Sequence, residues 1–199
     1  LGLARGLLGA RELEQRLAGD DALTALAGTV RALELSGDLV EVKAGCLAAP
    51  EKLGVLVGRL NCNARGFGFV SPLREKDGPD VYISSEDQGE AMHGDLVAIS
   101  VTKPLGRRAS GRGPAGRVVR VVEHARREVV GTFHRDGHLA YVEPTDSRLY
   151  RDIYIPSGAA KHAQPGDRVV AAITAWPRRG LNPEGVIQRV LGDSSDPRV

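Results

Sequence analysis

The sequence has few aromatic residues, only two cysteines and no long hydrophobic run. Tryptophan occurs once, phenylalanine three times and tyrosine four times among 199 residues. Cys46 and Cys62 have no metal-ligand spacing, so we expect two free thiols in a reducing compartment. No stretch approaches the roughly 18 consecutive apolar residues of a membrane span, and the N-terminus carries no secretion signal. We therefore expect a cytoplasmic location and no membrane partner.

What is present favours a chain of short strands. Hydrophobic residues make up 42% of the sequence, enough for a buried core, and 25 glycines and 11 prolines are typical of many turns. From Val55 onward, alternating or β-branched runs are separated by Gly, Pro, Asp and Asn. These runs are residues 55–60, 67–70, 81–83, 96–101 and 117–122. The pattern predicts a mainly β protein built on small antiparallel barrels.

The first part of the chain has helical periodicity instead. Leu13 and Leu17, and then Leu26, Val30 and Leu33, recur at three- and four-residue steps. Residues 20–21 are a candidate N-cap for the second helix, residues 36–38 are expected to end it, and residues 39–42 are expected to begin a strand. This order resembles the back half of a winged-helix module. A plain helical hairpin that packs on the next domain is an equally open alternative.

An internal repeat dominates the rest of the sequence. Five segments recur in order, at an offset of 72 or 73 residues that falls to 69 at the last pair. The paired segments are 57–58 with 130–131, 69–72 with 141–144, 80–83 with 152–155, 91–97 with 163–169, and 116–118 with 185–187. We predict two copies of one five-stranded unit.

Several repeated residues are expected to serve turns. Gly94-Asp95 and Gly166-Asp167 each precede a strand and suit a tight turn with positive φ. Asp80 and Asp152 stand directly before strands and are expected to do similar work. His93 has no counterpart in the second copy and is expected to be a surface or turn histidine.

The net charge of +2 conceals a basic middle segment. Residues 103–135 contain nine basic side chains against Glu123 and Glu128. The nine are Lys103, Arg107, Arg108, Arg112, Arg117, Arg120, Arg126, Arg127 and Arg135. Arginine offers a planar fork for phosphate and a face that stacks on a base, so the segment is a candidate phosphate-tracking patch. A solvated basic linker is the alternative.

One motif predicts binding of unpaired bases. Phe67 and Phe69 are two residues apart and leave the same face of a strand, with glycines beside them and Arg65 before them. Together with Tyr82, these rings predict a stacking platform for single-stranded nucleic acid. The alternative is that one or both phenylalanines belong to the core.

Residues 66–70 and 80–84 resemble the two RNA-binding motifs of cold-shock domains, which are OB-type barrels. With a second barrel following, the order of elements resembles the N-terminal region of bacterial ribonuclease R. The supporting segments include residues 116–123, 130–133, 142–146, 175–177 and 185–192. The resemblance implies a winged-helix-like segment at 1–53, cold-shock OB domains at 54–125 and 126–193, and the start of a linker at 194–199. Since Leu1 is not methionine, we expect a piece of a longer protein.

The resemblance also implies a function. That family degrades RNA processively from the 3′ end, with magnesium held by aspartates in a C-terminal domain that we expect this chain to lack. We therefore expect no catalytic residue, metal or cofactor here, single-stranded RNA as partner, and the missing nuclease domain as a second partner. The expected RNA-binding residues are Arg65, Phe67, Phe69, Tyr82, Arg117, Arg120, Arg135, Tyr141, Tyr154 and Arg178.

The second copy departs from the motif of the first. Only Tyr141 and Tyr154 keep aromatic rings there, and we expect Arg135, Arg148 and Arg151 to surround them. This barrel is therefore expected to bind backbone more than bases, or to guide the strand. Trp176 is expected to be a packing residue, and Arg178 to lie in a loop near phosphate. We expect weak sequence preference; the sequence leaves the choice between RNA and DNA open.

Two other functions fit the same sequence. One is a free-standing RNA chaperone of the cold-shock type without nuclease activity. The other is a structural module whose barrel faces contact protein.

Overall fold

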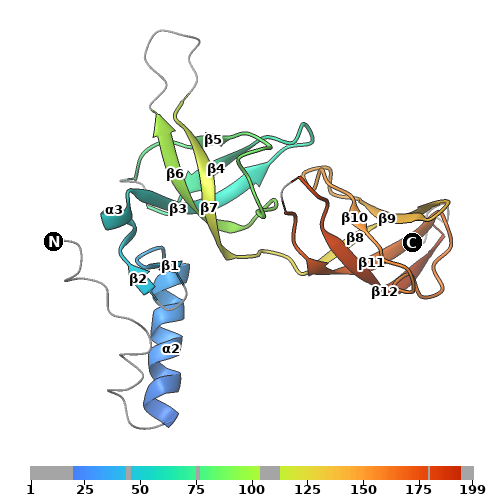
Figure 1. Ribbon diagram of the computed structural model, residues 1–199, viewed down its shortest axis with the longest axis horizontal. Coiled ribbons are helices and arrows are strands. Elements are labelled where there is room, and N and C mark those ends of the chain that lie inside the picture. Colours follow the sequence, from blue (N-terminus) through green and yellow to red (C-terminus); the bar gives the residue numbers. More distant parts are fainter. Residues whose placement is uncertain (1–19, 44–45, 75–76, 104–112, 179, 194–199) are drawn as a thin grey trace.

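The computed structural model describes residues 20–43, 46–74, 77–103, 113–178 and 180–193. The protein is mainly β, with two closed five-stranded barrels preceded by a short helical segment (Figure 1). The N-terminal elements are α2 (Asp20–Leu35), β1 (Val40–Lys43), β2 (Cys46–Ala48) and α3 (Pro50–Leu53). The first barrel has β3 (Val55–Cys62), β4 (Gly68–Pro72), β5 (Val81–Ile83), β6 (Leu96–Lys103) and β7 (Ala115–Glu123). The second has β8 (Glu128–Asp136), β9 (Leu139–Pro144), β10 (Ile153–Tyr154), β11 (Asp167–Ala175) and β12 (Glu184–Asp193).

The two barrels repeat one topology, as the internal repeat predicts. The first closes in the order β3-β4-β5-β7-β6, and the second, read from β8, in the order β8-β9-β10-β12-β11. Among the described strands of each barrel, the only parallel pair joins the third and fifth strands, β5 with β7 and β10 with β12. The predicted runs from Val55 onward fall on strands, except that Phe67 lies one residue before β4, because their alternation places one face of each strand inside a closed barrel.

Each barrel has its own apolar core. Branched aliphatic side chains fill the first, including Leu60, Val70, Val81, Ile83, Val97 and Ile99. The second is built around the fully buried Phe133, packed with Val142, Ile153, Val169 and Ile187. Burial of this apolar area is the main driving force for folding of both barrels.

The N-terminal segment packs on the first barrel. The α2 helix ends where predicted: Gly37 has a φ of +76° and the N–H of Asp38 donates to the carbonyl oxygen of Leu33. A two-stranded hairpin, β1 with β2, follows. Val40 of this hairpin is buried against Val57 of the barrel. The other predicted helix, around Leu13 and Leu17, lies outside the described residues.

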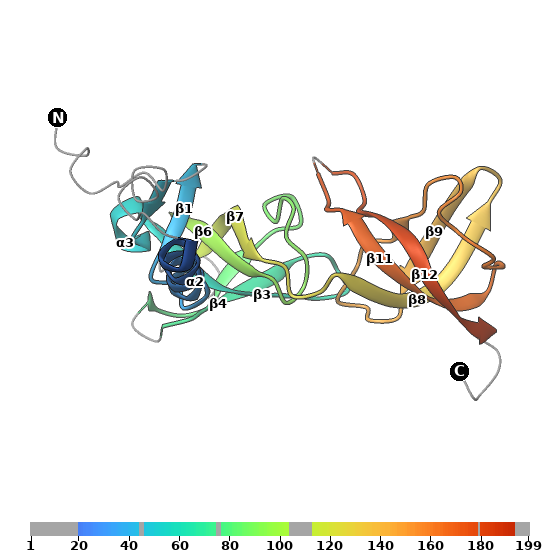
Figure 2. The ribbon, with the colours of Figure 1, turned by 90° about the horizontal axis from the view of Figure 1, so that it is seen from below.

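The barrels lie end to end along the long axis of the molecule (Figures 1 and 2). Residues 124–127 connect them, and the ring of His124 stacks on Trp176 with 3.4 Å between centroids and 7° between planes. Trp176 also packs against the second core, so its predicted packing role is confirmed. Met92, which precedes β6 of the first barrel, is buried in the core cluster of the second. The connection is therefore made by packed side chains as well as by the chain itself.

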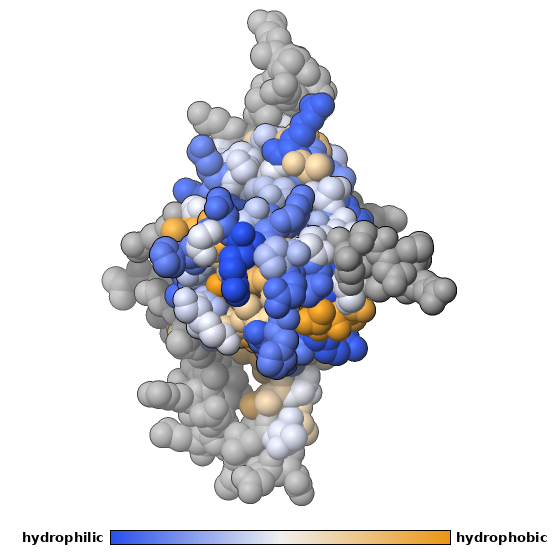
Figure 3. Space-filling view, turned by 90° about the vertical axis from the view of Figure 1, so that its right-hand side faces the viewer, coloured by the Kyte–Doolittle hydropathy of each residue, from blue (hydrophilic) through white to orange (hydrophobic). Residues whose placement is uncertain are grey.

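Seen from the end that carries the second barrel, the described surface is mostly hydrophilic, with small hydrophobic patches between polar side chains (Figure 3). Among the helices of the described ranges, none has the length and apolar character needed to cross a membrane.

Candidate nucleic-acid interface

Three aromatic side chains form a cluster on the outer face of the first barrel. Phe69 on β4 is the register partner of Tyr82 on β5, so both leave the same face of the sheet. Their ring centroids lie 5.8 Å apart, and Phe67 lies 6.0 Å from Phe69 and 5.6 Å from Tyr82. Phe69 is 41% exposed. Phe67, Phe69 and Tyr82, here called the ring cluster, therefore offer aromatic surface outside the buried core.

Two glycines allow this arrangement. A Cβ on Gly68 would lie 2.8 Å from the carbonyl oxygen of Asn61 on the neighbouring strand. Gly66 has a φ of +86°, and a Cβ there would lie 3.2 Å from the ring of Tyr150. Both glycines therefore let neighbouring groups approach β4, which carries Phe69, and the residues just before it, which carry Phe67.

A buried side chain holds the loop in front of the ring cluster. Gln88 is fully buried; its Nε2 donates to the carbonyl oxygen of Gly66 at 2.9 Å, and its Oε1 accepts a hydrogen bond from the hydroxyl of Tyr150 at 3.2 Å. Tyr150 belongs to the second barrel, so that barrel braces the loop that presents Phe67. Sequence reasoning missed both residues, because neither lies in a recognisable motif.

His93 lies in the turn before β6 but is buried. Its Nδ1 accepts the backbone N–H of Cys62 at 3.2 Å. Burial, followed by the charge of Arg148, lowers the pKa of His93 below its usual value. The turn placement is thus confirmed, and the surface alternative is wrong because a backbone N–H required this acceptor.

The outer face of the second barrel carries a smaller aromatic set. Tyr141 on β9 is the register partner of Tyr154 on β10 and of His134 on β8. The rings of His134 and Tyr141 stack at 5.1 Å and 17°. Leu139, two residues before Tyr141, takes the place that Phe67 has in the first copy and is 51% exposed. Sequence reasoning found the two tyrosines and missed His134.

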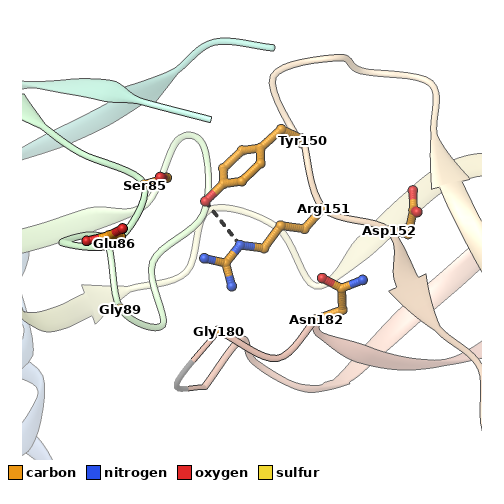
Figure 4. A pocket seen from close by; sticks show the side chains of 8 residues that line it. All are labelled: Ser85, Glu86, Gly89, Tyr150, Arg151, Asp152, Gly180 and Asn182. Atoms are coloured by element: carbon orange, nitrogen blue, oxygen red, sulfur yellow. Dashed lines mark hydrogen bonds between the residues drawn. The ribbon is translucent and has the colours of Figure 1, made fainter. Parts of the chain in front are cut away.

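Two hollows adjoin these faces. The inter-barrel hollow, about 640 Å³, lies between loops of the two barrels (Figure 4). It is lined by Ser85, Glu86, Gly89, Tyr150, Arg151, Asp152, Gly180 and Asn182. The second-barrel hollow, about 740 Å³, is lined by Leu139, Tyr141, Asp152, Tyr154, Gly180, Leu181, Asn182 and Glu184. Because Asp152, Gly180 and Asn182 line both, the two hollows adjoin each other.

The arginines are less uniformly placed than the sequence suggests. Arg65 and Arg117 are exposed, and Arg117 lies two residues beyond Ala115, the register partner of Tyr82. Arg120 instead forms an ion pair with Glu41 of the N-terminal hairpin. Arg178 forms one with Glu90 at 3.1 Å.

Among the three arginines expected around Tyr141 and Tyr154, only Arg151 lines one of these hollows, the inter-barrel hollow, where its Nε donates to the hydroxyl of Tyr150. Arg135 lies 5.5 Å from the ring of Phe133. Arg148 donates two hydrogen bonds to Asp146, and these lower the pKa of that carboxyl. The side chains of Lys103, Arg107, Arg108, Arg112 and Arg179 lie outside the described residues.

Comparison with known proteins places this geometry in a family. Residues 58–121 match the Ribonuclease B OB domain and residues 141–199 match a cold shock domain. Ribonuclease R of Escherichia coli is 36% identical over 182 residues, which cover 92% of this chain and 22% of the relative. Ribonuclease R of Thermotoga maritima is 35% identical over 133 residues, 66% of this chain and 18% of the relative.

The chain belongs to the ribonuclease R homologues of the RNB family. It corresponds to their N-terminal OB and cold-shock region and spans about a fifth of the length of the relatives it matches.

Solved structures share the fold. Yeast Ssd1, described as a pseudonuclease, superposes with a TM-score of 0.63 at 25% identity, over 74% of this chain and 24% of that one. Ribonuclease R of Mycoplasma genitalium, solved in complex with ribose methylated single-stranded RNA, superposes with a TM-score of 0.60 at 21% identity, over 72% and 22% of the two chains.

No group of three or more His, Cys, Asp or Glu side chains that could hold a metal ion occurs within the described part of this chain.

The two thiols are expected to react differently. Burial, followed by the negative charge of Asp95, raises the pKa of Cys62 to about 12, so near pH 8 its thiolate is scarce as well as inaccessible. Cys46 is partly exposed. Iodoacetamide should therefore modify Cys46 and spare Cys62 in the folded protein, and modify both in denaturant, as read by mass spectrometry. A Cys46→Ser variant should show no rapid modification; equal labelling rates would contradict the assignment.

Proposed function

We propose that this chain binds single-stranded RNA along one continuous path. The path begins at the ring cluster, passes Tyr150 and the inter-barrel hollow, and reaches the outer face of the second barrel. The observation that carries the proposal is the ring cluster itself, three mutually contacting rings on an outer barrel face with Phe69 41% exposed. The complex of the Mycoplasma genitalium relative with single-stranded RNA supports it.

Stacking is the expected source of affinity. Every base has a π face, and each stacked base contributes roughly 1–3 kcal/mol. In a duplex these faces are already occupied, so the ring cluster should select unpaired strands. Arg65 and Arg117, both exposed, are suited to contact phosphates beside it. Arg120 and Arg178 would have to leave carboxylate partners first and are weaker candidates.

We further propose that this region guides RNA to the nuclease domain of a longer protein, a processive 3′→5′ exoribonuclease. The similarity of nearly the whole chain to ribonuclease R supports this reading. RNA binding without hydrolysis is the second candidate, and the similarity to a structure described as a pseudonuclease favours it. Assay of the full-length gene product for release of nucleotides from a labelled single strand separates the two.

A Phe69→Ala variant tests the binding proposal. Loss of one stacking ring is expected to weaken binding of single-stranded RNA by roughly 1–3 kcal/mol, or about 5- to 150-fold, with little change for duplex RNA. Fluorescence anisotropy with labelled oligonucleotides measures both.

Val190→Ala is a matched control, because Val190 on β12 is an apolar side chain with a similar exposure of 42%. It lies six residues along the strand from Glu184, the register partner of Tyr154, and outside the aromatic positions. The affinity of the Val190→Ala variant for single-stranded RNA should stay unchanged. If Phe69→Ala lost equal affinity for single-stranded and duplex RNA, stacking would be refuted.

A further inference from the structure

The second-barrel hollow combines an aromatic wall with polar groups that have no protein partner. Tyr141 and Tyr154, side by side in register, form the wall together with Leu139. Leu181, which is 69% exposed, lines the hollow from the loop between β11 and β12. The hollow, of about 740 Å³, thus combines aromatic and aliphatic surface with polar side chains that can fix the orientation of a bound group.

Asp152 is the acidic side chain that the two hollows share. It lines both hollows, and within the described ranges its carboxylate takes part in no hydrogen bond or ion pair. Burial, followed by the charge of Glu143, raises its pKa, so the ionised carboxylate is poorly solvated. Such a group gains more than an exposed carboxylate from N–H donors of a ligand.

Asn182 supplies the complementary chemistry. It too lines both hollows, and Figure 4 shows its side chain with that of Asp152 along the right-hand side of the inter-barrel hollow. Its amide can donate a hydrogen bond where the Asp152 carboxylate can only accept. Together they present an acceptor pair and a donor beside a stacking surface.

The charges around the hollow favour a base over a phosphate. The charged residues that line the second-barrel hollow are Asp152 and Glu184, and both are acidic. They would repel a phosphate group, whereas a neutral base can enter while the backbone stays outside.

Resting on the proposed RNA binding, the geometry points to a guanine site: a guanine of the bound strand stacks on Tyr141 and Tyr154, donates its N1–H and N2–H to Asp152, and accepts from Asn182 at O6. Guanine alone among the four bases has two adjacent N–H donors on its Watson–Crick edge beside a carbonyl acceptor. Adenine and cytosine offer one exocyclic amino group, and uracil offers one ring N–H.

The site belongs to the second copy of the repeat. Asp80 is the equivalent of Asp152 in the first barrel and is exposed. Ser71 and Asn61, hydrogen-bonded to each other, occupy the places of Glu143 and His134. The preference should therefore apply to one nucleotide and leave the strand otherwise free in sequence.

The test uses uridine oligonucleotides of about 12 nucleotides with one central guanosine, adenosine or inosine, read by anisotropy. The guanosine oligonucleotide is expected to bind about tenfold more tightly than the adenosine one, as the loss of a charge-assisted hydrogen bond implies. Inosine, which lacks the N2 amino group, should fall between them.

Asp152→Asn should bind the guanosine and adenosine strands equally, whereas Asp80→Asn should keep the preference. Asn182→Ser should reduce it, which gives a second variant if Asp152→Asn unfolds by circular dichroism. Equal binding of the guanosine and adenosine strands by the wild-type protein, or an undiminished preference in Asp152→Asn, overturns the guanine site. Failure to bind any of the strands would instead overturn RNA binding itself.

Discussion

An Asp95→Ala variant is expected to lose about 3–5 kcal/mol of unfolding free energy, because one buried carboxylate accepts hydrogen bonds from several groups at once. Asp95 is 1% exposed. Its Oδ2 accepts the N–H of Met92 and its Oδ1 that of Ala125, each at 2.9 Å. Oδ2 also lies 2.9 Å from Nδ1 of His124. Truncation leaves two backbone donors without their partner, that of Met92 in a buried setting and that of Ala125 in a partly buried one. Urea unfolding followed by circular dichroism measures the loss.

The repeat supplies a matched control in Asp167, the equivalent residue of the second copy. Its Oδ2 accepts one hydrogen bond, from the N–H of Gln164 at 2.7 Å in an exposed setting. Asp167→Ala should therefore lose only about 1 kcal/mol. Equal losses for the two variants would show that the turn, rather than the buried carboxylate, carries the stability.

A Gly58→Ala variant is expected to lose about 3 kcal/mol by overpacking the first barrel. A Cβ there would lie 2.3 Å from the carbonyl oxygen of Ser71 and 2.7 Å from Cγ1 of Val70. The first contact is with backbone of the paired strand β4, which cannot move away without breaking the β3–β4 ladder. The thermal unfolding midpoint and the urea midpoint should both fall.

For Gly28→Ala, no loss of unfolding free energy is expected. Gly28 lies in α2, and a Cβ there would meet nothing within 4 Å. Alanine is favoured over glycine in a helix by up to about 1 kcal/mol, so this variant should be neutral or stabilising. If Gly28→Ala lost as much stability as Gly58→Ala, the destabilisation of Gly58→Ala would not be due to the close approach of β3 and β4.

The barrels and the ring cluster were predictable because both follow from two-residue periodicity. The spacing of Phe67 and Phe69 predicted a shared face, although Phe67 lies one residue before β4. Gly58 and Gly131 recur in the repeat because each lies against the backbone of the next strand. The aromatic wall of the second barrel was found in the same way, since Tyr141 repeats the place of Phe69 and Tyr154 that of Tyr82.

What could not be predicted depends on contacts between distant residues. Tyr150 reaches Gln88 across the junction of the barrels, and no local pattern indicates that pair. Arg120 belongs to the basic segment by composition, yet its partner is Glu41. His93 is buried because a backbone N–H of Cys62 needed an acceptor, which only the folded chain reveals.

The packed connection between the barrels also determines how strongly the RNA contacts of the first barrel and those of the second can reinforce each other. Residues 124–127 are fixed by Asp95 on one side and by the stack of His124 on Trp176 on the other. A strand held at the ring cluster would therefore meet the second barrel at a constant separation, as an intramolecular event. Effective concentrations for closely linked sites reach about the millimolar range, so avidity can greatly exceed the affinity of either face. An equimolar mixture of detached barrels would have no such advantage.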